Sequence, residues 1–162
     1  MNVSLTIIFS YSYSEKPEDY NLPADYTYVE KLWGNLFYKI YEARNYGAAK
    51  AQCEFDGATL AIPRSVAEND FIADLIPNWY IWIGINDIDQ EGLFVAVDGS
   101  HISWTKWAQG QPDNNENWGD DGQDGVVILQ GTDLQNIPKS WDDQVVSDSR
   151  RFVCLRYLTR IL

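Results

Sequence analysis

The 162-residue chain is poor in histidine, cysteine and positive charge, with one His, two Cys and 12 Lys or Arg against 24 Asp or Glu. A single histidine excludes zinc sites built from several histidines. The formal net charge of -12 would repel a phosphate backbone, so we expect no nucleic-acid binding. No apolar run approaches the length of about 18 residues that a membrane helix needs, so we expect no membrane span.

The sequence also lacks a recognisable nucleophile and base pair. His101 ends the turn-like stretch Asp98-Gly99-Ser100-His101, where a solvated loop histidine is the ordinary interpretation. The close carboxylates of the chain resemble a glycosidase pair only superficially, because they cluster as metal ligands do. We therefore expect a protein that is not an enzyme.

The composition is that of one globular domain. Its length predicts a single core, and 45% hydrophobic residues with 14% aromatics argue against disorder. We expect an N-terminal segment over residues 1–32 and a domain over residues 33–162. Serines and tyrosines alternate over residues 10–14, which predicts a strand. That strand either pairs with another subunit, giving a homo-oligomer, or adds to the chain's own sheet.

Two helices are predicted early in the domain. Asn45 suits the N-cap of a helix over residues 46–55, and Gly57 suits its C-terminal stop. A capping box formed by Ser65 and Glu68 begins a second helix, which Pro77 ends.

The remaining regular segments are predicted strands, and they lie at residues 36–41, 79–85, 93–97, 126–130 and 151–157. Helices segregated before a run of strands indicate an α+β domain. A polar stretch of Asn, Asp and Gly over residues 108–125 is long for a loop in a compact domain, which favours a functional role.

Oxygen-bearing side chains concentrate in and after this polar stretch: Asp113, Glu116, Asp120, Asp121 and Asp124, the neighbouring Asn114, Asn115, Asn117 and Gln123, then Asp142 and Asp143. Such oxygens are the ligands of a hard cation, and calcium takes 6–8 of them from flexible loops. The alternative is a solvated acidic loop. Trp118 lies inside the loop and suits either stacking on the apolar face of a sugar or a packing anchor.

The two cysteines lie in the first helix and the last strand. A bond between Cys53 and Cys154 would close a loop of about 100 residues and stabilise the fold by up to about 4.7 kcal/mol in a chain-entropy treatment. Spacing alone leaves this bond and two free buried thiols as equal alternatives.

From Leu36 to Tyr157 the chain resembles the C-type lectin-like domain family. The resemblance rests on Cys53, Trp82-Ile83-Gly84-Ile85, Glu91-Gly92, Phe94, Asp98-Gly99-Ser100, Trp104, Trp107, Gln111-Pro112-Asp113, Trp141-Asp142-Asp143 and Phe152-Val153-Cys154. It implies a fold of two helices, antiparallel sheets and a long calcium-binding loop region. It also implies the Cys53–Cys154 disulfide and therefore a secreted, extracellular protein.

The resemblance implies a Ca²⁺ site formed by Gln111, Asp113, Gln123, Asp142 and Asp143, with a cis peptide bond before Pro112. Sugar would be bound by Gln111, Asp113, Trp118 and Asp142. The Gln-Pro-Asp motif is associated with galactose-type sugars, so we expect galactose or N-acetylgalactosamine on glycans as the ligand. A second metal site would use Asp87, Glu91, Asn114 and Asp124.

The chain departs from the family pattern at three places. Gln123 stands where a Glu is usual, and Asp142 stands where an Asn would offer an amide donor to the sugar. Gly125 and Val146 occupy the positions of a second disulfide. These departures support an alternative function, a protein-binding or assembly domain on the same fold without sugar binding.

Overall fold

The structure is a computed structural model that describes residues 20–31, 34–115, 122–131 and 137–158. Its elements follow in the order β1 (Thr27–Val29), β2 (Leu36–Arg44), α1 (Tyr46–Phe55), β3 (Thr59–Leu60), α2 (Val66–Leu75), β4 (Ile81–Asn86), β5 (Val95–Ala96), β6 (Gly125–Ile128), β7 (Trp141–Gln144) and β8 (Arg150–Tyr157). The described strands form one sheet in the order β1-β2-β8-β4-β6-β7, with β3 on β8 and β5 on β4. The predicted α+β class is confirmed.

The sheet is mixed, although antiparallel sheets were expected. Strands β4 and β8 run parallel, with Ile81 beside Arg151 and Trp82 beside Phe152. The other pairings of the described strands are antiparallel. A parallel pair needs a long connection, and here the chain between the two strands supplies β5, the polar loop, β6 and β7.

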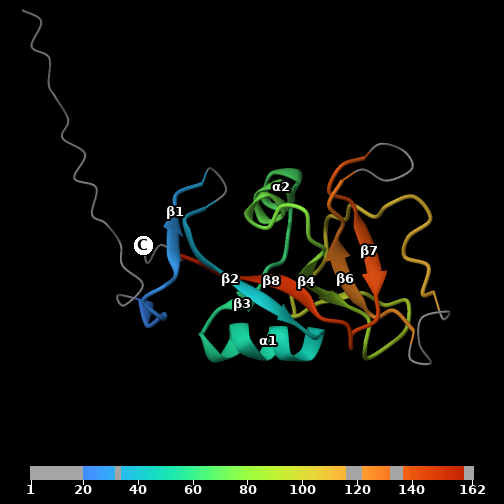
Figure 1. The fold of residues 1–162 in the computed structure, drawn as a ribbon, viewed down its shortest axis with the longest axis horizontal. Coiled ribbons are helices and arrows are strands. Elements are labelled where there is room, and N and C mark those ends of the chain that lie inside the picture. Colours follow the sequence, from blue (N-terminus) through green and yellow to red (C-terminus); the bar gives the residue numbers. More distant parts are fainter. Residues whose placement is uncertain (1–19, 32–33, 116–121, 132–136, 159–162) are drawn as a thin grey trace, which may run out of the picture.

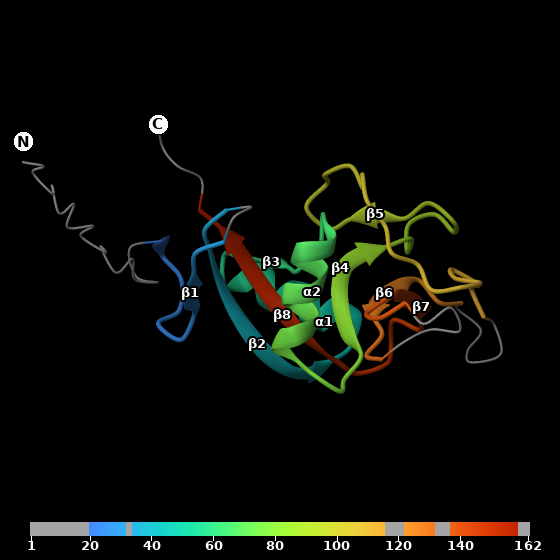
Figure 2. The same cartoon turned by 90° about the horizontal axis from the view of Figure 1, so that it is seen from above.

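The two helices cover opposite faces of the β2–β8 pair (Figure 1). Successive side chains of a strand point to opposite faces, so each strand contributes to two cores. Leu36 and Val153 pack in the core that contains Ile72 of α2. Phe37 and Phe152 pack in the core that contains α1. Strands β6 and β7 lie at the end of the molecule away from β1, beside the polar loop (Figures 1 and 2).

Both predicted helix starts are confirmed. The Asn45 side chain accepts a hydrogen bond from the Ala48 N–H at 2.8 Å, and α1 begins at the next residue. Ser65 Oγ accepts from the Glu68 N–H at 3.2 Å, and the Glu68 carboxylate accepts from the backbone N–H of Arg64. The Ala48 and Glu68 N–H groups are among those that a helix start leaves without a partner.

The sequence prediction was incomplete for the short strands. Strands β1, β3 and β7 were not predicted, and the strand expected over residues 93–97 is reduced to Val95–Ala96. Runs of two to four residues carry little periodicity, so their pairing depends on neighbours supplied by the fold. The predicted strand over residues 10–14 lies outside the described residues.

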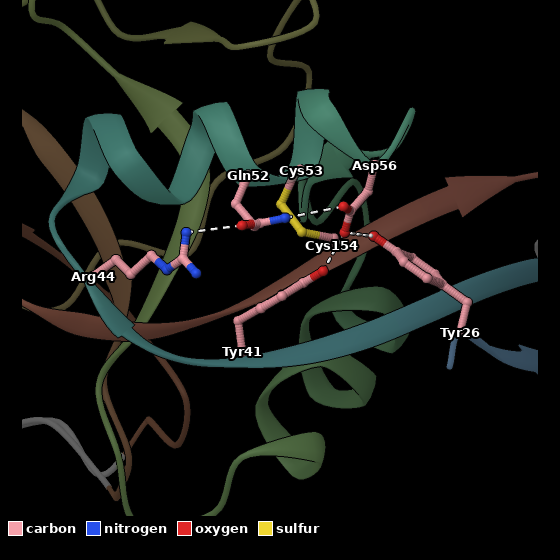
Figure 3. The surroundings of a disulfide bond; sticks show 7 residues. All are labelled: Tyr26, Tyr41, Arg44, Gln52, Cys53, Asp56 and Cys154. Carbon is pink, nitrogen blue, oxygen red and sulfur yellow. Dashed lines mark hydrogen bonds between the residues drawn. A yellow bond between two sulfur atoms is a disulfide. The ribbon is translucent and has the colours of Figure 1, made fainter. Parts of the chain in front are cut away.

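Cys53 and Cys154 form a disulfide that joins α1 to β8 (Figure 3). Both cysteines are fully buried in the core on the α1 side of the sheet. The bond spans 101 residues of sequence and links the beginning of the domain to its end. The pairing implied by the family resemblance is thereby confirmed.

A buried carboxylate next to this disulfide joins three parts of the chain. Asp56, 6% exposed, accepts hydrogen bonds from Tyr26 Oη at 3.1 Å, from Gln52 Nε2 at 3.0 Å and from the Tyr41 hydroxyl. Figure 3 shows these side chains converging on it. Burial, and then the Asp56 charge, raise the pKa of Tyr26, so its hydroxyl stays a donor. Tyr26 and the buried Leu22 belong to the predicted N-terminal segment, so this part of the segment packs on the domain.

We predict that Asp56→Asn lowers the free energy of unfolding by about 1–3 kcal/mol, because an amide cannot accept from all three donors and leaves one of them unpaired. Urea unfolding measures the loss. Glu54→Gln is the matched control, because Glu54 lies two residues before Asp56, in an exposed pair with Lys50. Equal stabilities of the two variants would contradict a structural role for the Asp56 contacts.

The surroundings of Gly84 in β4 leave no room for a side chain. A Cβ there would lie 2.5 Å from the Leu60 carbonyl oxygen, which is backbone and cannot rotate away. We predict that Gly84→Ala costs about 1–3 kcal/mol of unfolding free energy. Gly47→Ala in α1 is the control: a Cβ there would make an ordinary contact at 3.9 Å with Asn45 Oδ1 and would raise helix propensity, so it should be neutral or stabilising. A wild-type melting temperature for Gly84→Ala would contradict the steric argument.

Candidate functional site

The candidate site is organised by Asp143 of β7. Its carboxylate is fully buried and accepts hydrogen bonds from the backbone N–H groups of Asp113 at 3.1 Å and Asn114 at 2.7 Å. Along β7, Trp141 and Asp143 are buried, whereas Asp142 and Gln144 are half-exposed. The alternation of the strand therefore places one acid under the polar loop and leaves the other at the surface.

The loop approaches Asp143 through a cis peptide bond between Gln111 and Pro112, as the resemblance implied. The Gln111 N–H donates to the Ala108 carbonyl at 3.0 Å, which closes the turn before the bond. Gln111 Oε1 is buried and has no hydrogen-bond partner among the described residues. A buried acceptor without a donor is costly, and a bound cation would satisfy it.

Gln123 is attached to the same loop from the other side. Its Oε1 accepts from the Asn115 N–H at 2.8 Å, and its own N–H donates to Asn114 Oδ1 at 2.7 Å. The Gln123 side chain is 5% exposed, so its amide is held in place inside the loop. Gly122 precedes it with φ +73°, and a Cβ there would clash with Asn114 Oδ1. Glycine is needed for the loop to close on Asn114.

The surroundings of Asp142 change the pKa of its carboxyl group. Burial, followed by repulsion from Asp143 and Asp113, raises the pKa of Asp142 to about 6. Gln144 Nε2 donates to Asp142 Oδ2 at 2.7 Å and opposes this rise in part. The structure therefore places these three carboxylates within electrostatic reach of one another, and a cation would relieve their repulsion.

The donor set fits a hard cation in chemistry. Every candidate ligand offers oxygen, and each carboxylate oxygen that accepts one N–H keeps a second lone pair. Within the described ranges, no three His, Cys, Asp or Glu side chains gather closely enough to hold a metal by themselves. A cation held here would therefore also need amide oxygens, and Gln111 and Gln123 are the amide ligands predicted from the sequence.

The second candidate site centres on Asp87, which is 1% exposed. Its Oδ2 accepts from the Gly92 N–H at 2.8 Å, whereas Oδ1 is buried without a partner among the described residues. Burial, with a contribution from the charges of Glu91 and Asp124, raises the pKa of Asp87 to about 6. Asn114, the fourth predicted ligand, already accepts from the Gln123 N–H through Oδ1.

The described tryptophans of this region are packed. Trp141 is fully buried, donates from Nε1 to Asn69 Oδ1 at 2.7 Å, and meets the rings of Trp104 and Trp107 edge-on. They fix β7 and the start of the polar loop. Trp118, predicted to stack on a sugar, lies outside the described residues, as do Asp120 and Asp121.

The missing second disulfide has a packing counterpart. A Cβ on Gly125 would lie 2.9 Å from the Trp82 ring and 3.1 Å from the Tyr46 ring. The Val146 carbonyl accepts from the Tyr46 N–H at 3.0 Å. The packing of Gly125 on two aromatic rings and a backbone hydrogen bond to Val146 thus tie together the segments that the disulfide would join.

Sequence reasoning missed one polar residue of the site, Gln144. It lies two residues after Asp142, and residues at this spacing in a strand share a face. The signal was present in the sequence, but it depended on β7 being a strand, which was not predicted.

The family model described as "Lectin C-type domain" matches residues 42–156. The chain belongs to this family. It is 33% identical over 132 residues to "Lectin BRA-3" of Megabalanus rosa, which covers 75% of this chain and 76% of that protein. It is 39% identical over 122 residues to "Collectin-10" of Xenopus tropicalis, covering 73% of this chain and 40% of the collectin.

Among solved structures, the chain resembles the C-type carbohydrate-recognition domain of cow CD23, determined in the presence of a GlcNAc2Man3 oligosaccharide. The TM-score is 0.68 at 26% identity, with 85% of this chain and 96% of that chain covered. No helix in the described part of the chain is long and apolar enough to cross a membrane.

We predict that Asp87→Asn stabilises the protein in EDTA at pH 7 by about 2–6 °C in melting temperature, because it removes a buried charge. The wild-type pKa of about 6 lies above the unfolded value of 3.8. The contribution of Asp87 is therefore fully present below pH 3.8 and lost as the pH rises through 6. Thermal unfolding of both proteins at pH 4 and pH 7 measures the gap, which should close at the lower pH. A gap that does not change with pH would overturn the assignment.

Proposed function

We propose that the protein is a calcium-dependent lectin for galactose or N-acetylgalactosamine on extracellular glycans. The observation that carries the proposal is the attachment of the loop after the cis Gln111–Pro112 bond to Asp143. In the proposed site, this attachment would bring oxygen donors of the loop toward those of β7. The family membership supports carbohydrate recognition as the general function.

Some residues of the site hold the loop in place, and others would bind the cation and the sugar. Asp143 holds the loop backbone, and Gln123 holds Asn114 and Asn115. Gln111, Asp113 and Asp142 remain as the side chains that would hold both cation and sugar. When bound, calcium would supply a positive centre on which two vicinal sugar hydroxyls complete the coordination shell.

The galactose preference rests on the Gln-Pro-Asp order at residues 111–113, which places a neutral amide before the proline and an acid after it. The stacking role of Trp118 stays a prediction. The buried disulfide supports an oxidising, extracellular location. A single exposed sugar buries little area, so useful affinity requires several sites presented together. Assembly through residues 1–32 would provide them and stays a prediction.

The alternative function is a protein-binding or assembly domain without sugar binding. The observation that favours it is the occupation of oxygens at the site, because Gln123 Oε1 and Asp142 Oδ2 already accept hydrogen bonds. Calcium would then order the loop for a protein partner.

We predict that N-acetylgalactosamine releases binding heat with calcium and none in EDTA, and that Asp113→Ala weakens binding at least about tenfold by removing an exposed ligand. Isothermal titration measures both. Asp74→Ala is the matched control, because Asp74 is exposed on α2 and pairs with Lys139.

If calcium raises the melting temperature and neither galactose nor N-acetylgalactosamine binds, the assembly role replaces the lectin. If calcium has no effect on stability or binding, the metal assignment is wrong as well.

A further inference from the structure

The candidate sugar site lacks an amide donor at Asp142, and the structure places one beside it. Gln144 follows Asp142 by two residues on β7, and both side chains are half-exposed on the same face of the strand. Gln144 Nε2 donates to Asp142 Oδ2 at 2.7 Å. The Asp142 carboxylate, which stands where an Asn amide is usual, is thus hydrogen-bonded to the Gln144 amide.

The orientation of that amide is fixed by Arg150 at the start of β8. Arg150 Nη2 donates to Gln144 Oε1 at 3.2 Å and to Asp148 Oδ2 at 2.7 Å. A guanidinium only donates hydrogen bonds, so the carbonyl end of the Gln144 amide must face it. The NH₂ end is then forced toward Asp142. The pairing of Arg150 with Asp148 keeps the guanidinium in place.

We propose that Gln144 contacts the sugar and determines specificity, by supplying the amide donor that Asp142 cannot. The NH₂ group carries two hydrogens, and one is used by Asp142 Oδ2. The second is available to a hydroxyl oxygen of a neutral sugar held at Asp142. This inference rests on the proposed lectin function, and it assigns Arg150 as the residue that positions Gln144.

A paired exchange of side chains tests the proposal. Gln144→Leu keeps much of the volume and removes the amide, so N-acetylgalactosamine affinity in calcium should fall about five- to tenfold. Adding Asp142→Asn to Gln144→Leu returns an amide donor to the site and should restore most of the affinity. Ser147→Ala, in the exposed turn after β7, is the matched control and should bind like wild type.

Two further measurements separate contact from structure. The melting temperature of Gln144→Leu in EDTA reports any loss of folding, and calcium affinity without sugar reports any loss of the metal. In the wild-type protein, the Gln144 side-chain amide resonance should shift when N-acetylgalactosamine is added in calcium. Arg150→Met should weaken sugar binding less than Gln144→Leu, because it frees the amide without removing it.

Each outcome decides the matter. If wild type binds sugar and Gln144→Leu binds equally well, the assignment of Gln144 is wrong while the lectin function stands. If Asp142→Asn fails to rescue Gln144→Leu although the double variant folds and binds calcium, Gln144 is structural. If wild type binds no galactose-type sugar in calcium, the lectin function and the role of Gln144 fall together.

Discussion

The site depends on one buried carboxylate. Asp143 accepts two backbone hydrogen bonds from the residues that follow the cis proline bond, and these bonds join this part of the loop to β7. A backbone N–H bound to a buried anion is among the stronger polar contacts of a protein. The Asp143 side chain is held in turn by the alternation of β7, whose other buried residue, Trp141, is anchored by Asn69 and two further tryptophans. The position of the loop therefore depends on β7 residues that are buried in the core.

The same arrangement concentrates negative charge where water is scarce. Asp87 and Asp142 both have pKa values raised to about 6, chiefly by burial, and both lie beside other acids. Each candidate site also holds a buried oxygen without a partner among the described residues, on Gln111 and on Asp87. Side chains in this state destabilise the fold, and a bound cation would relieve that cost.

A second group of buried contacts stabilises the fold around α1. The Cys53–Cys154 disulfide and the Asp56 contacts lie on the α1 side of the β2–β8 pair (Figure 3), and both cores extend from β2 and β8 into β6. Gln123 and Asp142 depart from the usual family pattern, and the fold is retained.

The sequence by itself determined the two helices, the longer strands and the oxygen-rich character of the polar loop, because caps, periodicity and composition are local properties. The family resemblance implied the disulfide and the cis bond, which the structure contains. Only the tertiary structure decided the short strands, the parallel β4–β8 pair and the bonding of Gln144 to Asp142, because these depend on which segments become neighbours. A spacing of two residues puts Asp142 and Gln144 on the same face only in a strand. The segment β7 is a strand because it pairs with β6.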